Sequence, residues 1–333
     1  MDVAVVYSLP TRRALAAPYA ETEQDTVDSA GEVARALKEK GAMVTMVPID
    51  EDHIDVIRRV KTDCIVNLID WTGLDLPLSD TAFSEIEKTG IPVTGASRAN
   101  YMLTSDKVTM KQALDANNLP TPRWQLFRGF DEPVRDDFQY PVIVKLALEH
   151  CSIGLTHDAV VENKEDLITR VRERRKEFHE PVFAEEFLSG REFQVTVLHT
   201  EGGLRVLPPA EITYQTKGVK ALLTYASRWD ENDPDYDTSD VILAKLSSSL
   251  ADAIEKVSIK TFQALTYRDY IRLDLRMRGE SLFILEANSN PGLSHSEDYG
   301  MTVSYMAAGM TFADFVWEIV LSALRRARKQ ARG

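Results

Sequence analysis

The chain has 333 residues, enough for two or three compact domains with buried cores, so a small disulfide-stapled scaffold is excluded. Acidic residues outnumber basic residues by 52 to 39, and the resulting net charge of −13 argues against general nucleic-acid binding. No apolar run is long enough to span a membrane and the first residues lack signal-peptide features, so we expect a cytoplasmic protein. The basic segment Arg325–Lys329 is interpreted as complementing the dipole of a last helix.

The first 95 residues alternate short apolar runs with helical patterns, which is typical of a parallel sheet with crossover helices. The strands are expected at 3–7, 43–47, 64–69 and 91–94, and the helices at 26–40 and 79–89. No G-x-G-x-x-G motif follows the first strand, so a dinucleotide-binding cradle is not expected there. We predict an N-terminal α/β domain over residues 1–95.

The remaining residues predict a central subdomain over 96–186, a small α+β unit, and a C-terminal subdomain over 187–333. The central helices are expected at 105–117 and 164–178, and the central strands at 124–127, 142–145 and 182–187. Residues 192–207 are expected to form two strands, followed by a long loop over 208–240 that has the length of a lid. A helix at 241–265, strands at 269–277 and 281–287, and a terminal helix from about 311 complete the prediction.

Charged residues alternate with apolar ones along one predicted C-terminal strand. Arg272, Asp274 and Arg276 share one face of it. The next strand ends in Glu286 and Asn288, which also share a face. Mg²⁺ in proteins is held by such oxygen-bearing side chains together with substrate phosphates, so Asp274, Glu286 and Asn288 are candidate metal ligands. On spacing alone, a solvated sheet face with an Asp/Arg ion pair is an equally good interpretation.

The turn that follows has backbone N–H groups and hydroxyls that could bind an oxyanion or a carboxylate. With the preceding Arg272-x-Asp274 pair, this part of the chain resembles the C-terminal signature of D-alanine–D-alanine ligases and their ATP-grasp relatives. The matching segment reads Glu286-Ala287-Asn288-Ser289-Asn290-Pro291-Gly292-Leu293-Ser294-His295-Ser296. The resemblance implies a three-domain ATP-grasp fold, with the N-terminal parallel-sheet domain as its pre-ATP-grasp part.

Other segments follow in the order of that family and span most of the chain. By this resemblance, Lys107 in Ser105-Asp106-Lys107 and Lys145 would contact the phosphates of ATP. A loop at 149–154 would fold over the phosphates, with Cys151 as a binding residue and Ser152 as a catalytic one. The residues implied to contact adenine and ribose are Glu185, Glu186, Leu188 and Glu192. Each match alone is weak, because a lone lysine or glutamate is usually a solvated charge, and the order and spacing carry the case.

The resemblance also implies a reaction, with ATP and Mg²⁺ or Mn²⁺ as cofactors. A small-molecule carboxylate would attack the γ-phosphoryl group, and a small-molecule amine would then displace phosphate from the acylphosphate to form an amide. Arg272 and the N–H of Gly292 would stabilise the tetrahedral oxyanion. Residues 208–240 lie where the family has its ω-loop, a lid that keeps water from the acylphosphate. In this lid Arg228 is implied to contact the nucleotide and Trp229 the substrate.

The chain departs from the family in its substrate-binding parts. The glycine-rich loop after the first strand is not recognisable, and for the family's ammonium-binding glutamate only Glu21, Glu23 and Asp25 are rough candidates. Cys151 replaces a serine, and Arg228-Trp229 replaces a Lys-Tyr pair. We therefore expect substrates other than two D-alanines. Cys151 is interpreted as a small loop residue rather than a nucleophile, because only the adjacent histidine could activate it.

The second-substrate pocket is expected near Ser296, which matches a family serine that binds the carboxylate of the incoming amino acid. Glu297 follows it, where D-alanine-selective relatives carry an apolar residue. A carboxylate there would favour a polar or cationic acceptor; an equally good interpretation is that Glu297 points to solvent or pairs with an arginine.

Two alternatives to the amide-forming ligase stay open: an ATP-grasp enzyme whose acceptor is not an amine, and a nucleotide-binding protein without catalysis. Neither nucleic acid nor a membrane is an expected partner. A homodimer is possible, because many members of the resembled family are dimers.

Overall fold

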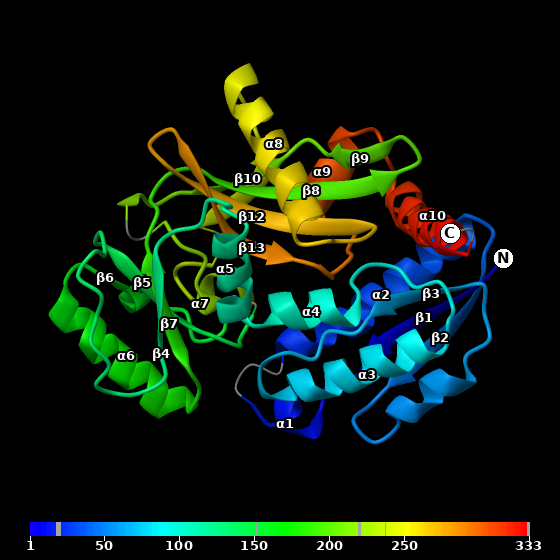
Figure 1. Ribbon diagram of the computed structural model, residues 1–333, viewed down its shortest axis with the longest axis horizontal. Coiled ribbons are helices and arrows are strands. Elements are labelled where there is room, and N and C mark those ends of the chain that lie inside the picture. Colours follow the sequence, from blue (N-terminus) through cyan, green and yellow to red (C-terminus); the bar gives the residue numbers. More distant parts are fainter. Residues whose placement is uncertain (18–20, 151, 219–220, 237, 332–333) are drawn as a thin grey trace.

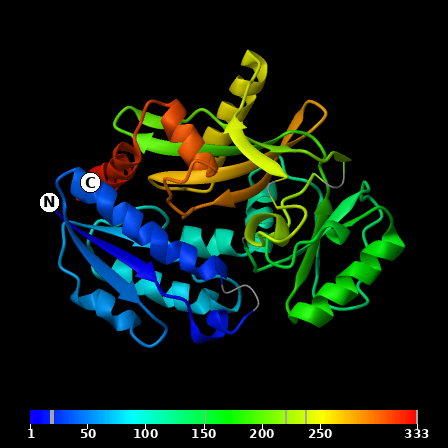
Figure 2. The same cartoon turned by 180° about the vertical axis from the view of Figure 1, so that it is seen from behind.

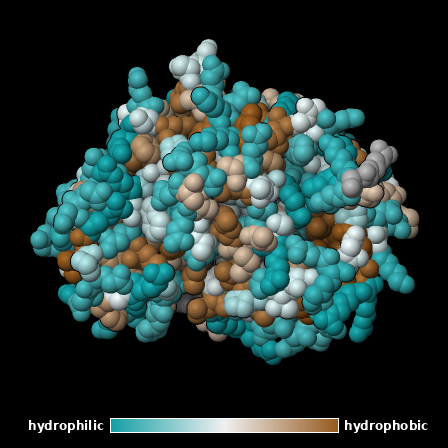
Figure 3. Space-filling view, in the orientation of Figure 1, coloured by the Kyte–Doolittle hydropathy of each residue, from teal (hydrophilic) through white to brown (hydrophobic). Residues whose placement is uncertain are grey.

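The computed structural model describes residues 1–17, 21–150, 152–218, 221–236 and 238–331. Three sheets organise the chain, and Figure 1 shows the N-terminal sheet at the lower right, the central sheet at the lower left and the C-terminal sheet above both. None of the described helices alone is long and apolar enough to cross a membrane. The helices Gly300–Ala307 and Phe312–Gln330 meet that length and composition only when taken together, and they are bent by 91° relative to each other. Hydrophilic residues cover most of the face shown in Figure 3, in keeping with the many charged residues.

The N-terminal sheet is parallel and ordered β2-β1-β3. Val3 and Val5 of β1 pack on one face with helices α2 (Glu21–Glu39) and α10 (Phe312–Gln330), while Ala4 and Val6 pack on the other face against α3 (Leu76–Lys88). This alternation is the period of two expected of a strand buried on both sides. The elements of this part are β1 (Asp2–Ser8), α1 (Arg12–Leu15), α2 (Glu21–Glu39), β2 (Met43–Ile49), η1 (Ile54–Arg59), β3 (Cys64–Leu68), η2 (Gly73–Asp75), α3 (Leu76–Lys88) and α4 (Arg98–Ser105).

The predicted strand at 91–94 is wrong as a full strand. Only an isolated bridge joins Val93 to Ile65, so the N-terminal sheet has three strands. Pro92 has no N–H to donate to a ladder, and Gly90 has a φ of +68° that turns the chain just before it.

The helix predicted at 105–117 is present from Lys107 to Ala116, and a separate helix that was not predicted, α4 (Arg98–Ser105), precedes it. Helix α4 ends at Ser105, and α5 (Lys107–Ala116) begins after Asp106, whose carboxylate accepts hydrogen bonds from the N–H groups of Val108 and Thr109. An aspartate at this N-cap position satisfies donors that the first turn leaves free. The new helix therefore starts with Lys107.

The central sheet is antiparallel and ordered β4-β7-β5-β6, with α6 packed on it. The described elements match the expected positions closely. They are β4 (Trp124–Phe127), β5 (Val142–Leu146), η3 (His157–Ala159), β6 (Val160–Val161), α6 (Lys164–Phe178) and β7 (Val182–Glu186).

The C-terminal sheet is antiparallel, with the order β11-β10-β8-β12-β13 and with β9 paired to β8. Its strands run above the other two sheets in Figure 1, and Figure 2 shows the same arrangement from behind. Its elements are β8 (Glu192–Thr200), β9 (Gly203–Val206), β10 (Ala210–Tyr214), α7 (Tyr225–Trp229), β11 (Ser239–Leu243), α8 (Ser248–Ala264), β12 (Tyr270–Arg278), β13 (Ser281–Asn288), α9 (Gly300–Ala307) and α10 (Phe312–Gln330).

Two predictions for this part are wrong. The expected loop at 208–240 contains strand β10 and helix α7, and the helix expected from Val241 begins only at Ser248. Val241 instead pairs with Ile212 of β10. The helix starts where the hydroxyl of Ser247 accepts a hydrogen bond from the N–H of Leu250, an N-cap that the apolar pattern alone did not reveal.

Asp269 joins the N-terminal domain to the C-terminal subdomain. Its fully buried carboxylate accepts hydrogen bonds from the N–H of Gly95 at 3.0 Å, the hydroxyl of Ser322 at 2.9 Å and the guanidinium of Arg326 at 2.9 Å. Part of the basic C-terminal segment therefore has a tertiary partner in addition to any interaction with the helix dipole.

Replacing Asp269 by Ala is expected to lower the free energy of unfolding by about 3–5 kcal/mol, because it removes a fully buried carboxylate and leaves the partly buried guanidinium of Arg326, a buried hydroxyl and a buried backbone N–H without their partner. Denaturant unfolding measures this change. Asp252→Ala, on the exposed face of α8, is the control and is expected to stay within about 0.5 kcal/mol of the wild type. A loss below about 1 kcal/mol for Asp269→Ala would show that the junction is weak.

Candidate active site

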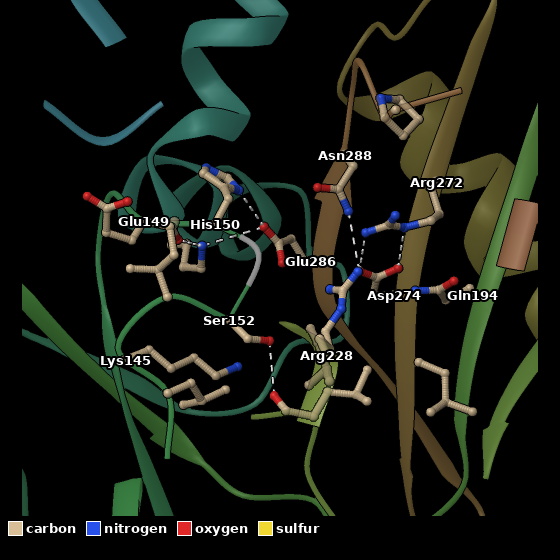
Figure 4. Close-up of a pocket in the computed structure, with 18 of the residues that line it drawn as sticks. Lys145, Glu149, His150, Ser152, Gln194, Arg228, Arg272, Asp274, Glu286 and Asn288 are labelled. Carbon is tan, nitrogen blue, oxygen red and sulfur yellow. Dashed lines mark hydrogen bonds and ion pairs between the residues drawn. The ribbon is translucent and has the colours of Figure 1, made fainter. Parts of the chain in front are cut away.

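A cavity of about 250 Å³ lies where the three sheets approach one another, and Figure 4 shows the side chains that line it. All three parts of the chain contribute to its walls. The polar residues lining it include Asp25, Asp70, Lys107, Lys145, Glu149, His150, Ser152, Glu185, Glu192, Gln194, Arg228, Arg272, Asp274, Glu286 and Asn288. Most of the predicted site residues are thus neighbours in space, although they are far apart in sequence.

Lys107 lies at the first position of α5, where the break at Asp106 places it. Its ammonium donates a hydrogen bond to the carbonyl of Glu149 and lies 3.6 Å from the carboxylate of Glu286. The start of a helix adds positive partial charge from its free N–H groups. This wall of the cavity is therefore suited to an anionic group.

Lys145 projects from β5 into the cavity (Figure 4) and forms an ion pair of 2.6 Å with Glu185. Glu185 is almost fully buried, and its second oxygen lies 2.7 Å from the ammonium of Lys111. Despite burial, the two ammonium groups hold the pKa of Glu185 below its usual range. The carboxylate raises the pKa of Lys145, although burial opposes it. Sequence reasoning missed Lys111, whose only signal is its position four residues after Lys107.

Three other predicted nucleotide residues line the same end of the cavity. Leu188 is buried, while the carboxylate of Glu186 accepts a hydrogen bond from Arg278 at 2.8 Å. Glu192 accepts one from the hydroxyl of Tyr214 at 2.8 Å and pairs with Arg276 at 3.1 Å. The contacts of Tyr214 and Arg276 with Glu192 were not predicted, because neither residue falls in a motif.

Asp274 and Glu286 lie directly opposite each other on β12 and β13, and Arg272 faces Asn288 in the same register. Arg272 donates two hydrogen bonds to Asp274, at 2.8 and 3.0 Å, and the amide of Asn288 lies 3.3 Å from the same carboxylate. Figure 4 shows these four side chains on adjacent strands. The predicted convergence of Asp274, Glu286 and Asn288 is thus present in the fold.

These side chains fit a hard divalent cation. The buried Oε1 of Glu286 has no hydrogen-bond partner by geometry among the described residues, and it faces the ammonium of Lys107 at 3.6 Å and Nδ1 of His150 at 3.3 Å. Lys107, His150 and Arg272 together hold the pKa of Glu286 well below its usual range, despite burial. Two carboxylates and an amide oxygen match the donor set that Mg²⁺ takes beside phosphates. Within the described ranges no group of three or more His, Cys, Asp and Glu side chains forms a metal cluster, so the amide is needed as the third donor.

The predicted phosphate loop borders the cavity, although Cys151 lies outside the described residues. Ser152 has a φ of +62°, and its hydroxyl donates to the carbonyl of Leu223 at 3.0 Å. His150, which was not predicted, lies 3.3 Å from Glu286 through Nδ1, and its Nε2 lies 3.1 Å from the carbonyl of Ser105. The loop therefore contacts both Leu223, just before α7, and Glu286, a candidate metal ligand.

The predicted substrate residues occupy different places. Arg228 of α7 lines the cavity and lies 5.6 Å from the ring of Trp229, which is absent from the described lining. Gly292 lines the cavity, and a Cβ there would lie 3.0 Å from the hydroxyl of Tyr299. Ser296 and Glu297 are exposed, and the hydroxyl of Ser296 donates to Asp298.

Two aspartates line the cavity near the N-terminal sheet. Burial raises the pKa of Asp70 to about 6, although His150 and a 3.2 Å hydrogen bond from the hydroxyl of Tyr101 oppose this. Burial also raises the pKa of Asp25, against the effect of Arg228. Sequence reasoning had Asp25 as a rough candidate and missed Asp70, which follows a buried strand without a recognisable motif. The side chains of Glu21 and Glu23 lie outside the described residues.

Comparison with known proteins assigns the fold and the family. Residues 114–321 match the family model of the D-ala D-ala ligase C-terminus. The chain is 33% identical over 72% of its length to the uncharacterised protein y4sG of Sinorhizobium fredii, covering 69% of that protein. It is 30% identical over 88% of its length to the D-alanine–D-alanine ligase of Desulforudis audaxviator, covering 92% of that enzyme.

Among solved structures, the D-alanine–D-alanine ligase of Bacillus anthracis complexed with ATP aligns over 99% of both chains, with a TM-score of 0.75 and 17% identity. That likeness confirms the ATP-grasp fold expected from the sequence. The family-model match and the relative from Desulforudis audaxviator show that the chain belongs to the D-alanine–D-alanine ligase family of ATP-grasp carbon–nitrogen ligases.

Proposed function

We propose that the protein uses ATP and Mg²⁺ to join a carboxylate to an amine through an acylphosphate, with substrates other than two D-alanines. The observation that supports this most is that two lysines and two carboxylates line the same cavity. Lys107 and Lys145 line it together with Asp274 and Glu286, which lie opposite each other on β12 and β13. Phosphoryl transfer depends mainly on such positioning and charge neutralisation.

In the first step, a carboxylate oxygen of one substrate attacks the γ-phosphorus of ATP, and the bond to the β–γ bridging oxygen breaks to release ADP. Lys107 and Lys145 hold the phosphate oxygens in this step. Asp274, Glu286 and Asn288 would hold the Mg²⁺, which when bound neutralises charge that develops on the phosphates.

In the second step, the amine of the other substrate attacks the acyl carbon, phosphate leaves, and the nitrogen loses its proton to give the amide. Arg272 and the N–H of Gly292 stabilise the negative charge on the tetrahedral oxygen, because both line the cavity beside the metal-binding strands. Helix α7 and the segment around it shield the reactive acylphosphate from water.

The substrate end of the cavity is acidic. Asp25 and Asp70 both line it, and neither has an ion-pair partner within 4.0 Å among the described residues. A substrate with a second cationic group would supply the missing positive charge. We therefore propose that at least one of the two substrates is a diamino or otherwise cationic compound.

D-Alanine alone is expected to be a poor substrate, with kcat/KM at least about a hundredfold below that for the best cationic pair, which corresponds to ~2.7 kcal/mol. The reason is that a small apolar side chain leaves the acidic side chains of the cavity without a partner. Phosphate release from ATP, measured over a panel of carboxylate and amine pairs, tests this. Efficient synthesis of D-alanyl-D-alanine would refute the proposed selectivity.

Asp70→Asn is expected to weaken the binding of a cationic substrate about ten- to hundredfold, because a hydrogen bond to a charged group contributes about 1.5–3 kcal/mol. In the wild type, KM for that substrate should rise as the pH falls below about 6, since the Asp70 carboxyl then gains a proton and loses its charge. The variant should lack this rise. A substrate without the second cationic group is the control, and an identical pH profile for both proteins would contradict the assignment.

The two alternatives predict different products in the same screen. A non-amine acceptor would give ADP and phosphate without an amide, and a non-catalytic protein would bind ATP without releasing phosphate. A homodimer and a cytoplasmic location stay predictions, to be checked by analytical ultracentrifugation and by cell fractionation. Asp25 and Asp70 line the cavity and Glu297 is absent from its described lining, so the two aspartates are the better explanation for a cationic substrate.

A further inference from the structure

Lys111 is a buried charge for which the proposed reaction has no direct use. Its side chain has no exposed surface and is absent from the described lining of the cavity. The ammonium donates to the hydroxyl of Thr121 at 2.7 Å and to the carbonyl of Ile284 at 3.3 Å, and it lies 2.7 Å from Glu185. Burial of such a group costs free energy that packed apolar residues of the same size would avoid. A purely structural role therefore explains the position poorly.

Glu185 connects Lys111 to the cavity. One of its oxygens faces Lys111, and the other accepts a hydrogen bond from Lys145 at 2.6 Å. The line Lys111–Glu185–Lys145 carries two positive charges and one negative charge, so its sum is one positive charge. Only Lys145 presents that charge to the cavity.

We propose that Lys111 is a positioning residue for nucleotide phosphates. It binds one oxygen of Glu185, so that the group of three side chains keeps a net positive charge and Lys145 keeps its position in the cavity. This inference rests on the proposed function, in which Lys145 contacts the phosphates of ATP. Lys111 acts through Glu185 and touches neither nucleotide nor substrate.

Without Lys111, both oxygens of Glu185 would be free to bind Lys145. The pair would then sum to zero charge, and the ammonium would be drawn toward the carboxylate and away from the cavity. The phosphates of ATP are charged and sense this loss, whereas adenosine is uncharged. ATP should therefore lose more affinity than adenosine.

The test is calorimetric titration of the full-length protein with ATP in the presence of Mg²⁺, and with adenosine, without other substrates. Lys111→Met is expected to reduce the preference for ATP over adenosine at least about tenfold. Lys111→Arg, which keeps the charge, should retain the wild-type preference within about threefold. Lys260→Met is the matched control, since Lys260 on α8 contacts only the exposed carbonyl of Asn118 among the described residues. The melting temperature of each variant separates unfolding from lost binding.

A double-mutant cycle sharpens the test. In a Glu185→Gln background, Lys111→Met should change the preference for ATP by less than about threefold, because no carboxylate remains to neutralise Lys145. Lys111→Gln, which keeps hydrogen bonding without the charge, serves as a second neutral variant if Lys111→Met does not fold.

Unchanged ATP preference in both neutral variants would overturn the role of Lys111 while leaving the proposed function intact. An equal effect of Lys111→Met in the presence and in the absence of Glu185 would also overturn it. Failure of the wild type to bind ATP would contradict the proposed function itself.

Discussion

Replacing Glu286 by Gln, or Asp274 by Asn, is expected to reduce turnover at least about a thousandfold, equivalent to ~4 kcal/mol of transition-state stabilisation. Each change removes one negative charge from the facing pair on β12 and β13. The remaining side chains would hold a divalent cation too weakly to neutralise the phosphates. Steady-state rates over a range of Mg²⁺ concentrations, measured on the best substrate pair, test this expectation.

Glu280→Gln provides the matched control. Glu280 is an exposed carboxylate at the turn that joins β12 to β13, so the same hairpin loses a charge far from the cavity wall. Its variant should keep wild-type activity. Near wild-type turnover of either Glu286→Gln or Asp274→Asn at ordinary Mg²⁺ concentrations would show that the metal assignment is wrong.

Arg272→Met is expected to lower kcat about a hundred- to a thousandfold, the usual cost of removing one donor to a developing oxyanion. Arg272 also donates two hydrogen bonds to the two oxygens of Asp274. A lysine ammonium cannot reproduce this two-pronged contact, so Arg272→Lys should recover little activity. Single-turnover measurements should show that amide formation slows more than ADP formation, because the oxyanion develops in the second step.

Arg205→Met, at an exposed position of β9, controls for the loss of an arginine from the same sheet. Equal slowing of ADP and amide formation by Arg272→Met would mean that Arg272 acts through Asp274 in the first step instead.

The sequence predicts well those parts of the cavity that depend on local pattern. The alternation of Arg272, Asp274 and Arg276 with apolar residues predicts a strand with one charged face, and the observed register brings Glu286 opposite Asp274. Period and spacing suffice here because paired strands keep side chains of one face together.

Other parts depend on contacts between distant segments, which no local pattern reveals. Lys111 meets Glu185, and Asp70 meets Tyr101, only after the chain has folded. Strand β10 was mistaken for loop because its alternation of apolar and polar residues extends over only five residues, and its pairing with β8 and β11 decides its structure. Helix α4 was missed because its eight residues are too short a run to show a helical period in the sequence.

The core around Asp269 has a consequence for how the chain can be divided. Residues of the N-terminal sheet, such as Val3 and Leu37, share one apolar cluster with Tyr270 and Phe315 of the C-terminal part. A fragment that starts after residue 95 would expose the apolar side of α10 to water and leave Asp269 and Arg326 without the backbone groups of Gly95 and Val93. We therefore expect the two ends of the polypeptide to unfold together, and an ATP-grasp half excised at that boundary to aggregate.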